Sequence, residues 1–253
     1  MSENPQPEQN PEQNPDNQDP KVNAIDSIEQ MGVSQMPQQA TSPIHCLSII
    51  GQIEGHVLLP PQNKTTKYEH LIPQLIAIEE NPQIKGFIVL MNTVGGDVEA
   101  GLAIAEMIAS MSKPSVSVVL GGGHSIGVPL ATCTNFSYIT STATMTVHPV
   151  RINGMIISVP QSYEYFDRMQ DRVIDFICRH SHISREKLTQ LMMCTGELAN
   201  DVGTVLLGQE AVEAGIIDAV GGLSDARKTL WELIEQGEKG ESTCSTPSDP
   251  STK

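Results

Sequence analysis

The sequence predicts an α/β fold, a stack of repeated strand–turn–helix units around a mostly parallel sheet. Apolar stretches of strand length alternate with stretches of helical periodicity along the middle of the chain. The run GFIVLMN at 86–92 is apolar throughout, as in a strand buried on both faces. A unit of strand, glycine turn and apolar helix occurs at 86–112 and again at 115–134, which indicates stacked repeats.

The predicted elements follow one another in a regular order. The strands are apolar or β-branched runs bounded by turn residues, and they lie at 44–53, 86–92, 114–120, 136–140, 144–147 and 216–219. The helices have apolar residues at helical spacing, and they lie at 67–80, 98–112, 126–134, 162–180, 184–194, 210–214 and 224–235. The helix at 98–112 is apolar almost all round, which predicts deep burial. Ser184 is the expected N-cap of the helix that it begins.

The folded domain is expected to span residues 43–236, between two polar tails. Residues 1–42 form an acidic tail rich in Pro, Gln and Asn, and Met1 is the only apolar side chain in its first 20 positions. Such a segment buries too little surface to offset the entropy lost on ordering. We therefore expect both this tail and residues 237–253 to be disordered.

Composition excludes several classes of partner. The net charge of −15 argues against binding to a nucleic-acid backbone or to an anionic membrane surface. The five cysteines are widely spaced without a zinc-binding pattern, which predicts a reducing, cytoplasmic setting and no metal site. No uninterrupted apolar run reaches 18 residues, so no membrane span is expected. We also expect no cofactor.

Two glycine-rich turns, TVGGDV at 93–98 and GGGHSI at 121–126, each join a buried strand to a buried helix. Such turns expose backbone N–H groups and point them along the helix dipole toward an anion. Neither turn has the spacing or the lysine of a phosphate-binding loop. An oxyanion hole is the alternative, with the amides of Gly96 and Ile126 as its donors.

Ser125 lies in the second turn, and its surroundings GHSIG match the nucleophile-elbow pattern G-x-S-x-G. His148 ends the strand at 144–147 and is the candidate general base. Two simpler interpretations remain open at this point. Ser125 can be a helix N-cap, and His148 can be a half-buried histidine bonded to backbone.

Four motifs carry a resemblance to a known family. They read NTVGGDVEAG (92–101), GGGHSIG (121–127), MTVHP (145–149) and EAVEAGIID (210–218). In this order they resemble the proteolytic subunit of the Clp protease, a family with the Clp/crotonase fold, over residues 48–235. The resemblance implies that Ser125 and His148 are catalytic and that Gly96 and Ile126 form the oxyanion hole. It is closest to a stand-alone subgroup of this family.

Two site assignments depart from the family pattern. The family places an aspartate seven residues before the glutamate of the fourth motif, but Gly203 occupies that place here. We take Asp201 as the candidate that orients His148. The strand that binds extended substrate in the family corresponds to RINGMIISVP at 151–160, in which Gly154 and Met155 are the expected substrate-binding positions.

The resemblance also implies a homo-oligomer. The helix at 162–180 has more apolar side chains than one face needs, as either an interface helix or a helix buried within a monomer would. The family's axial-loop segment before the first strand is replaced by the acidic tail. This departure argues against docking to a Clp-type ATPase.

We therefore predict a serine endopeptidase that cleaves unstructured peptides or small proteins through a Ser–His(–Asp) site. Two alternatives remain. One is a catalytically weak or inactive Clp-like ring subunit, which would assemble without hydrolysing peptides. The other is a crotonase-type acyl-CoA enzyme, which would use the same pair of oxyanion turns and would be retained on a CoA column.

Overall fold

A computed structural model describes residues 42–151, 158–196 and 202–244, with side chains up to residue 239. It has a sheet of eight described strands in which every pair is parallel except β6 with β7. The sheet order is β2-β1-β3-β4-β5-β8, and β6 pairs with β4 and with β7. The strands are β1 (Ile44–Glu54), β2 (Thr65–Lys67), β3 (Gly86–Gly96), β4 (Ser115–Gly123), β5 (Phe136–Ile139), β6 (Thr144–Val147), β7 (Thr204–Leu207) and β8 (Ala219–Val220).

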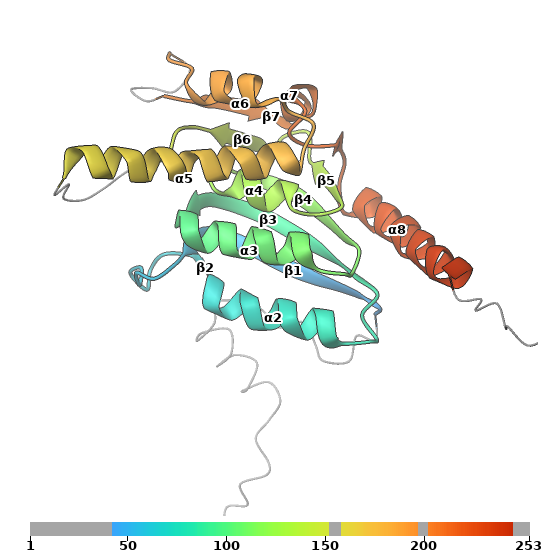
Figure 1. The fold of residues 1–253 in the computed structure, drawn as a ribbon. Coiled ribbons are helices and arrows are strands. Elements are labelled where there is room, and N and C mark those ends of the chain that lie inside the picture. The colour runs from blue at the N-terminus through green and yellow to red at the C-terminus, as the bar shows by residue number, and fades with distance from the viewer. Residues whose placement is uncertain (1–41, 152–157, 197–201, 245–253) are drawn as a thin grey trace, which may run out of the picture. The chain divides into compact units, whose positions relative to one another are not determined.

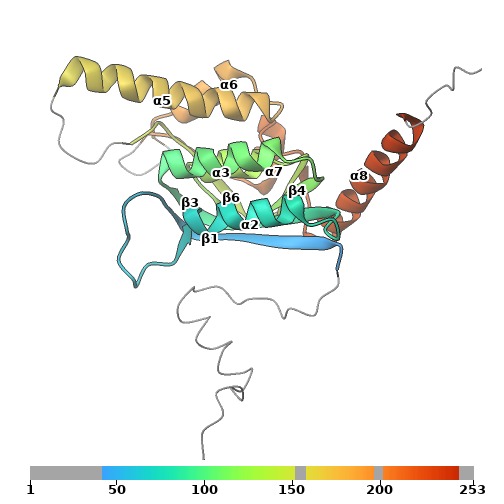
Figure 2. The same cartoon turned by 60° about the horizontal axis from the view of Figure 1, so that its bottom comes forward.

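Helices cover both faces of the central strands (Figure 1). The described helices are α2 (Tyr68–Glu80), α3 (Val98–Ser110), α4 (Gly127–Thr132), α5 (Val159–Arg179), α6 (Arg185–Met192), α7 (Gly208–Ala214) and α8 (Leu223–Cys244). Both views show α2 and α3 side by side over the same strands (Figure 2). They share the larger core cluster with α4, whereas α8 packs through Leu230 on the opposite face.

The side chains of β3 divide between these two cores, as the pleat requires. Phe87, Val89 and Met91 belong to the larger core, whereas Ile88 and Leu90 contact the α8 side. Because side chains alternate across a strand, burial on both faces produces an uninterrupted apolar run. The α/β class and the mostly parallel sheet predicted from this run are confirmed.

Some predicted boundaries differ from the observed ones. The predicted strand at 216–219 is wrong except at its last residue, since the observed strand is Ala219–Val220. Ile216 and Ile217 instead bury their side chains in the core after the turn that ends α7. Strands β2 and β7 were not predicted, since runs of three and four residues carry too little periodicity. Helix α5 begins at Val159 rather than 162, because proline is tolerated in the first helical turn.

The ends of the later helices follow local capping. Ser184 is the N-cap of α6, as predicted, and its side chain accepts a hydrogen bond from the Lys187 amide at 3.2 Å. Helix α8 continues to Cys244, beyond the predicted end at 235. In the part of the chain that the structure describes, no helix is long and apolar enough to cross a membrane.

Candidate active site

The ends of β3 and β4 bring the two glycine turns together. Thr93 of β3 pairs with Gly123 of β4, and the His124 amide donates to the Thr93 carbonyl at 3.2 Å. Parallel strands place their carboxyl ends at one edge of a sheet, so the turn after each strand opens on the same side. The site is therefore a consequence of the strand order.

Ser125 has an unusual backbone conformation. Its φ is 58°, and it is the one non-glycine residue with positive φ in the described part of the chain. A side chain in this region costs on the order of 1–3 kcal/mol and persists only where the surroundings impose it. The Ser125 amide donates to the Thr146 carbonyl at 2.8 Å, which holds the turn in place. A strained strand-to-helix turn is the geometry that the nucleophile-elbow pattern predicts for Ser125.

The N-cap interpretation of Ser125 is not supported by the geometry. The residue that precedes α4 is Ile126, and this cap has no side-chain hydrogen bond. Gly95, with φ 86°, lies against the serine, because a Cβ at position 95 would come within 2.7 Å of the Ser125 Cβ. The site thus has no room for a larger residue beside the hydroxyl.

The two predicted oxyanion donors line the same cavity as Ser125. The amides of Gly127 and Val128 donate to the carbonyls of His124 and Ser125. The amide of Ile126, the residue just before these two donors, has no hydrogen-bond acceptor among the described residues. At position 96 a Cβ would lie 2.2 Å from the Ile53 carbonyl oxygen, so only glycine lets the backbone approach there.

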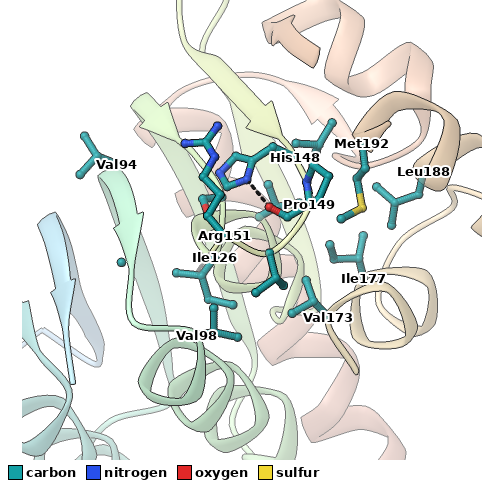
Figure 3. Close-up of a pocket in the computed structure, with 15 residues that line it drawn as sticks. Val94, Val98, Ile126, His148, Pro149, Arg151, Val173, Ile177, Leu188 and Met192 are labelled. Atoms are coloured by element: carbon teal, nitrogen blue, oxygen red, sulfur yellow. Dashed lines mark hydrogen bonds between the residues drawn. The ribbon is translucent and has the colours of Figure 1, made fainter. Parts of the chain in front are cut away.

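His148 follows β6 directly and lines this cavity too. Its Nδ1 lies 2.7 Å from the carbonyl oxygen of Pro149, as Figure 3 shows. A carbonyl can only accept, so Nδ1 carries the proton, and in the neutral ring Nε2 is the basic nitrogen. His148 is therefore bonded to backbone through Nδ1, as the simpler interpretation expected, while Nε2 remains the basic nitrogen. The described residues show no hydrogen bond between His148 and Ser125.

The cavity has a volume of about 220 Å³ and mostly apolar walls. Arg151 is the one cation among its described lining residues, and no carboxylate lines it there. The far wall comes from α5 and α6, which the motifs did not predict as part of the site (Figure 3). The apolar lining residues are Val94, Val98, Ile126, Val128, Val147, Pro149, Val150, Val173, Ile177, Leu188 and Met192.

His124, beside Ser125, is a second imidazole at the candidate site. Its Nδ1 lies 2.9 Å from the Thr146 hydroxyl. Burial lowers the pKa of His124 below its ordinary value, and the charge of His148 lowers this pKa further. Neither His124 nor Thr146 was predicted as a site residue. The histidine of GGGHS was the available signal, but nothing local indicated its partner on β6.

Three predicted site residues cannot be placed. Asp201, Gly154 and Met155 lie outside the described residues, so the third triad position and the substrate strand stay predictions. No group of three His, Cys, Asp or Glu side chains within the described ranges could hold a metal ion. The expectation that the protein needs no cofactor also stays a prediction.

Comparison with known proteins identifies the class to which this fold and site correspond. A family model described as Clp protease matches residues 41–223. The chain therefore belongs to the Clp protease family. This confirms the resemblance carried by the four motifs.

Individual relatives narrow the comparison. The chain is similar to the translocation-enhancing protein TepA of Halalkalibacterium halodurans, with 58% identity over 212 residues, which cover 84% of this chain and 83% of the relative. It is more distantly similar to the ATP-dependent Clp protease proteolytic subunit 1 of Chlamydia trachomatis and of Chlamydia muridarum. Identity with these two is 27% over 139 residues, which cover 53% of this chain and 68% of each relative.

Proposed function

We propose that this protein is a serine endopeptidase that cleaves unstructured peptides or small proteins. One observation carries the proposal. Ser125 is held at φ 58° on the wall of a cavity that it shares with His148 and with the amides of Gly96 and Ile126. A strained serine, an imidazole and paired backbone donors are the groups that acyl transfer requires.

The reaction would proceed in two halves. In the first, Nε2 of His148 takes the proton of Ser125 Oγ as this oxygen attacks the scissile carbonyl. The carbonyl oxygen becomes an oxyanion that the amides of Gly96 and Ile126 stabilise. The imidazolium then protonates the leaving amine, and an acyl-enzyme remains. In the second half, His148 takes a proton from water, which attacks the ester and releases the acid and the serine.

The orientation of His148 has one observed support and one proposed support. The Pro149 carbonyl accepts from Nδ1–H and keeps the tautomer in which Nε2 is basic. We propose that Asp201 assists this orientation, as the family pattern suggests. The imidazole must turn or shift toward Ser125 when substrate binds, since catalytic hydrogen bonds often tighten only in the complex.

The cavity also suggests how substrate binds. Its apolar walls suit an aliphatic side chain of the substrate next to the scissile bond. We propose that Gly154 and Met155 pair with the extended peptide backbone by strand addition. We further propose a homo-oligomer in the cytoplasm that does not dock a Clp-type ATPase. The four cysteines whose side chains are described are free thiols, which suits a reducing compartment.

A non-catalytic ring subunit is the second candidate. The observation that favours it is the absence, among the described residues, of a hydrogen bond from Ser125 to His148. The acyl-CoA alternative has less support. Arg151 is the one cation among the described residues that line the cavity, whereas the phosphates of CoA need several.

The test is labelling by a fluorophosphonate, followed by hydrolysis of a casein-like unfolded substrate. We expect label on Ser125 of the wild-type protein and none in Ser125→Ala. Hydrolysis should fall by roughly 10⁵-fold or more in this variant. Ser48→Ala, an exposed serine on β1, is the matched control and should behave as wild type. Unlabelled wild-type protein, or label that persists in Ser125→Ala, would refute the peptidase and favour the inactive subunit.

A further inference from the structure

His124 and Ser125 are attached to neighbouring strands by three hydrogen bonds outside the strand ladders. Two are between backbone groups, from His124 to Thr93 at 3.2 Å and from Ser125 to Thr146 at 2.8 Å. The third joins side chains, the His124 Nδ1 and the Thr146 hydroxyl, at 2.9 Å. Almost any residue can form the two backbone bonds. The third bond, in contrast, requires the particular side chains of His124 and Thr146.

The His124 ring occupies space that a side chain at position 122 would fill. A Cβ at position 122 would lie 2.7 Å from His124 Nε2, so the glycine leaves the volume that the imidazole fills. The Gly122 amide is in turn held by the Asn92 side chain, at 2.9 Å. The imidazole is therefore packed in a defined place between β4 and β6.

Thr146 links this ring to the general base. It lies on β6, two residues before His148, which follows this strand directly. One residue thus contacts the nucleophile turn twice, through its carbonyl and its hydroxyl, immediately before the chain reaches His148.

We propose that His124 is a positioning residue that ties the Ser125 turn to the strand carrying His148, through its hydrogen bond to Thr146. The inference rests on the proposed peptidase function. It assigns to His124 the task of keeping the hydroxyl and the base in register while Ser125 stays in its strained conformation.

The bond between His124 and Thr146 is made by a neutral imidazole. The titratable group that acts on His124 is His148, whereas β3 contributes the neutral Asn92 and Thr93. At neutral pH His124 is uncharged, because burial and His148 lower its pKa. Because the charge of His148 opposes a second charge here, His124 stays neutral over the pH range in which His148 is basic.

The test compares the rate of fluorophosphonate labelling against pH for wild type, Thr146→Val, His124→Ala and His124→Asn. We expect the first two variants to label roughly ten- to a hundredfold more slowly at the plateau, because the nucleophile is misplaced. His124→Asn should keep most of the plateau rate, since its amide can still reach the Thr146 hydroxyl. The acid limb, which protonation of His148 sets, should stay where it is in wild type, because His124 is uncharged while His148 titrates.

The matched control is Thr140→Val. This variant also removes a threonine hydroxyl, one that donates a 3.0 Å hydrogen bond to the Leu120 carbonyl rather than to His124 or Ser125. It should label as wild type does. Thermal midpoints report folding, and if His124→Ala does not fold, Thr146→Val decides. If wild type is labelled and both Thr146→Val and His124→Ala label at the wild-type rate, the inference about His124 is wrong but the peptidase proposal stands. A wild type without label on Ser125 removes the peptidase proposal and this inference together.

Discussion

Ser125 depends on the glycines that surround it. Gly95 has a φ of 86°, and a Cβ built there would lie 2.7 Å from both the His124 carbonyl oxygen and the Ser125 Cβ. Neither neighbour can move freely, since the His124 amide is bonded to Thr93 and the Ser125 amide to Thr146. The conformation of Ser125 therefore depends on residues of two strands, β3 and β6.

Replacing Gly95 tests this dependence. We expect Gly95→Ala to lower the free energy of unfolding by about 1–3 kcal/mol, because alanine is strained at positive φ and meets Ser125. Labelling of Ser125 should slow by roughly a hundredfold. Urea denaturation and labelling kinetics measure the two effects. Gly222→Ala is the control, since a Cβ there has no heavy atom within 4 Å. Equal behaviour of the two variants would contradict the packing argument.

At the scale of elements, the junction of β3 with α3 positions the predicted oxyanion donor. Asp97 is the N-cap of α3, and its Oδ1 accepts from the Ala100 amide at 2.8 Å. Its own amide donates to the Ile53 carbonyl of β1 at 3.0 Å. Gly96 is therefore held between a strand and a capped helix. This anchoring fixes where its amide lies.

Removing the N-cap of α3 should slow the reaction at Ser125. We expect Asp97→Ala to lower the free energy of unfolding by about 1 kcal/mol and to slow labelling of Ser125 by roughly tenfold, because the Gly96 amide loosens. Asp97→Asn keeps a capping oxygen and should retain most of both. Ser184→Ala removes the cap of α6 and should reduce stability similarly without slowing the reaction. Slowed labelling in that control would mean that stability alone sets the rate.

The whole molecule should be less stable in mild acid. Burial lowers the pKa of His45, His124 and His180 below the ordinary value near 6.5, and Arg179 lowers that of His180 further. The unfolded chain then binds more protons than the folded chain between the folded pKa values and 6.5. The stabilisation is therefore fully present above pH 6.5 and is lost as pH falls through the folded values.

Calorimetry checks this sign. We expect a lower thermal midpoint at pH 5 than at pH 7, with a shift of about 2–8 °C per kcal/mol of lost stability. His45→Gln should reduce the difference between the two pH values. His70→Gln, at an exposed position, should leave it unchanged. A midpoint that rises toward pH 5 would contradict the argument.

The class of fold could be read from the chain because its signals are local. A strand buried on both faces must be apolar throughout, as at 86–92, and a strand-to-helix turn at a site needs glycine, as at 95 and 96. Short strands were missed for the same reason. The four residues of β7 carry no period of their own, and they are extended because they pair with β6.

By itself, the amino-acid sequence determined the order of the longer elements, the two glycine turns, and Ser125 and His148 as the residues of interest, since each follows from local composition or motif. Only the tertiary structure decided that Thr146 holds the Ser125 turn, that His124 shares this contact, and that α5 and α6 wall the cavity. These contacts join residues 20 or more positions apart in the chain. They exist because the pairing of β6 beside β4 and the packing of the helices bring those residues together.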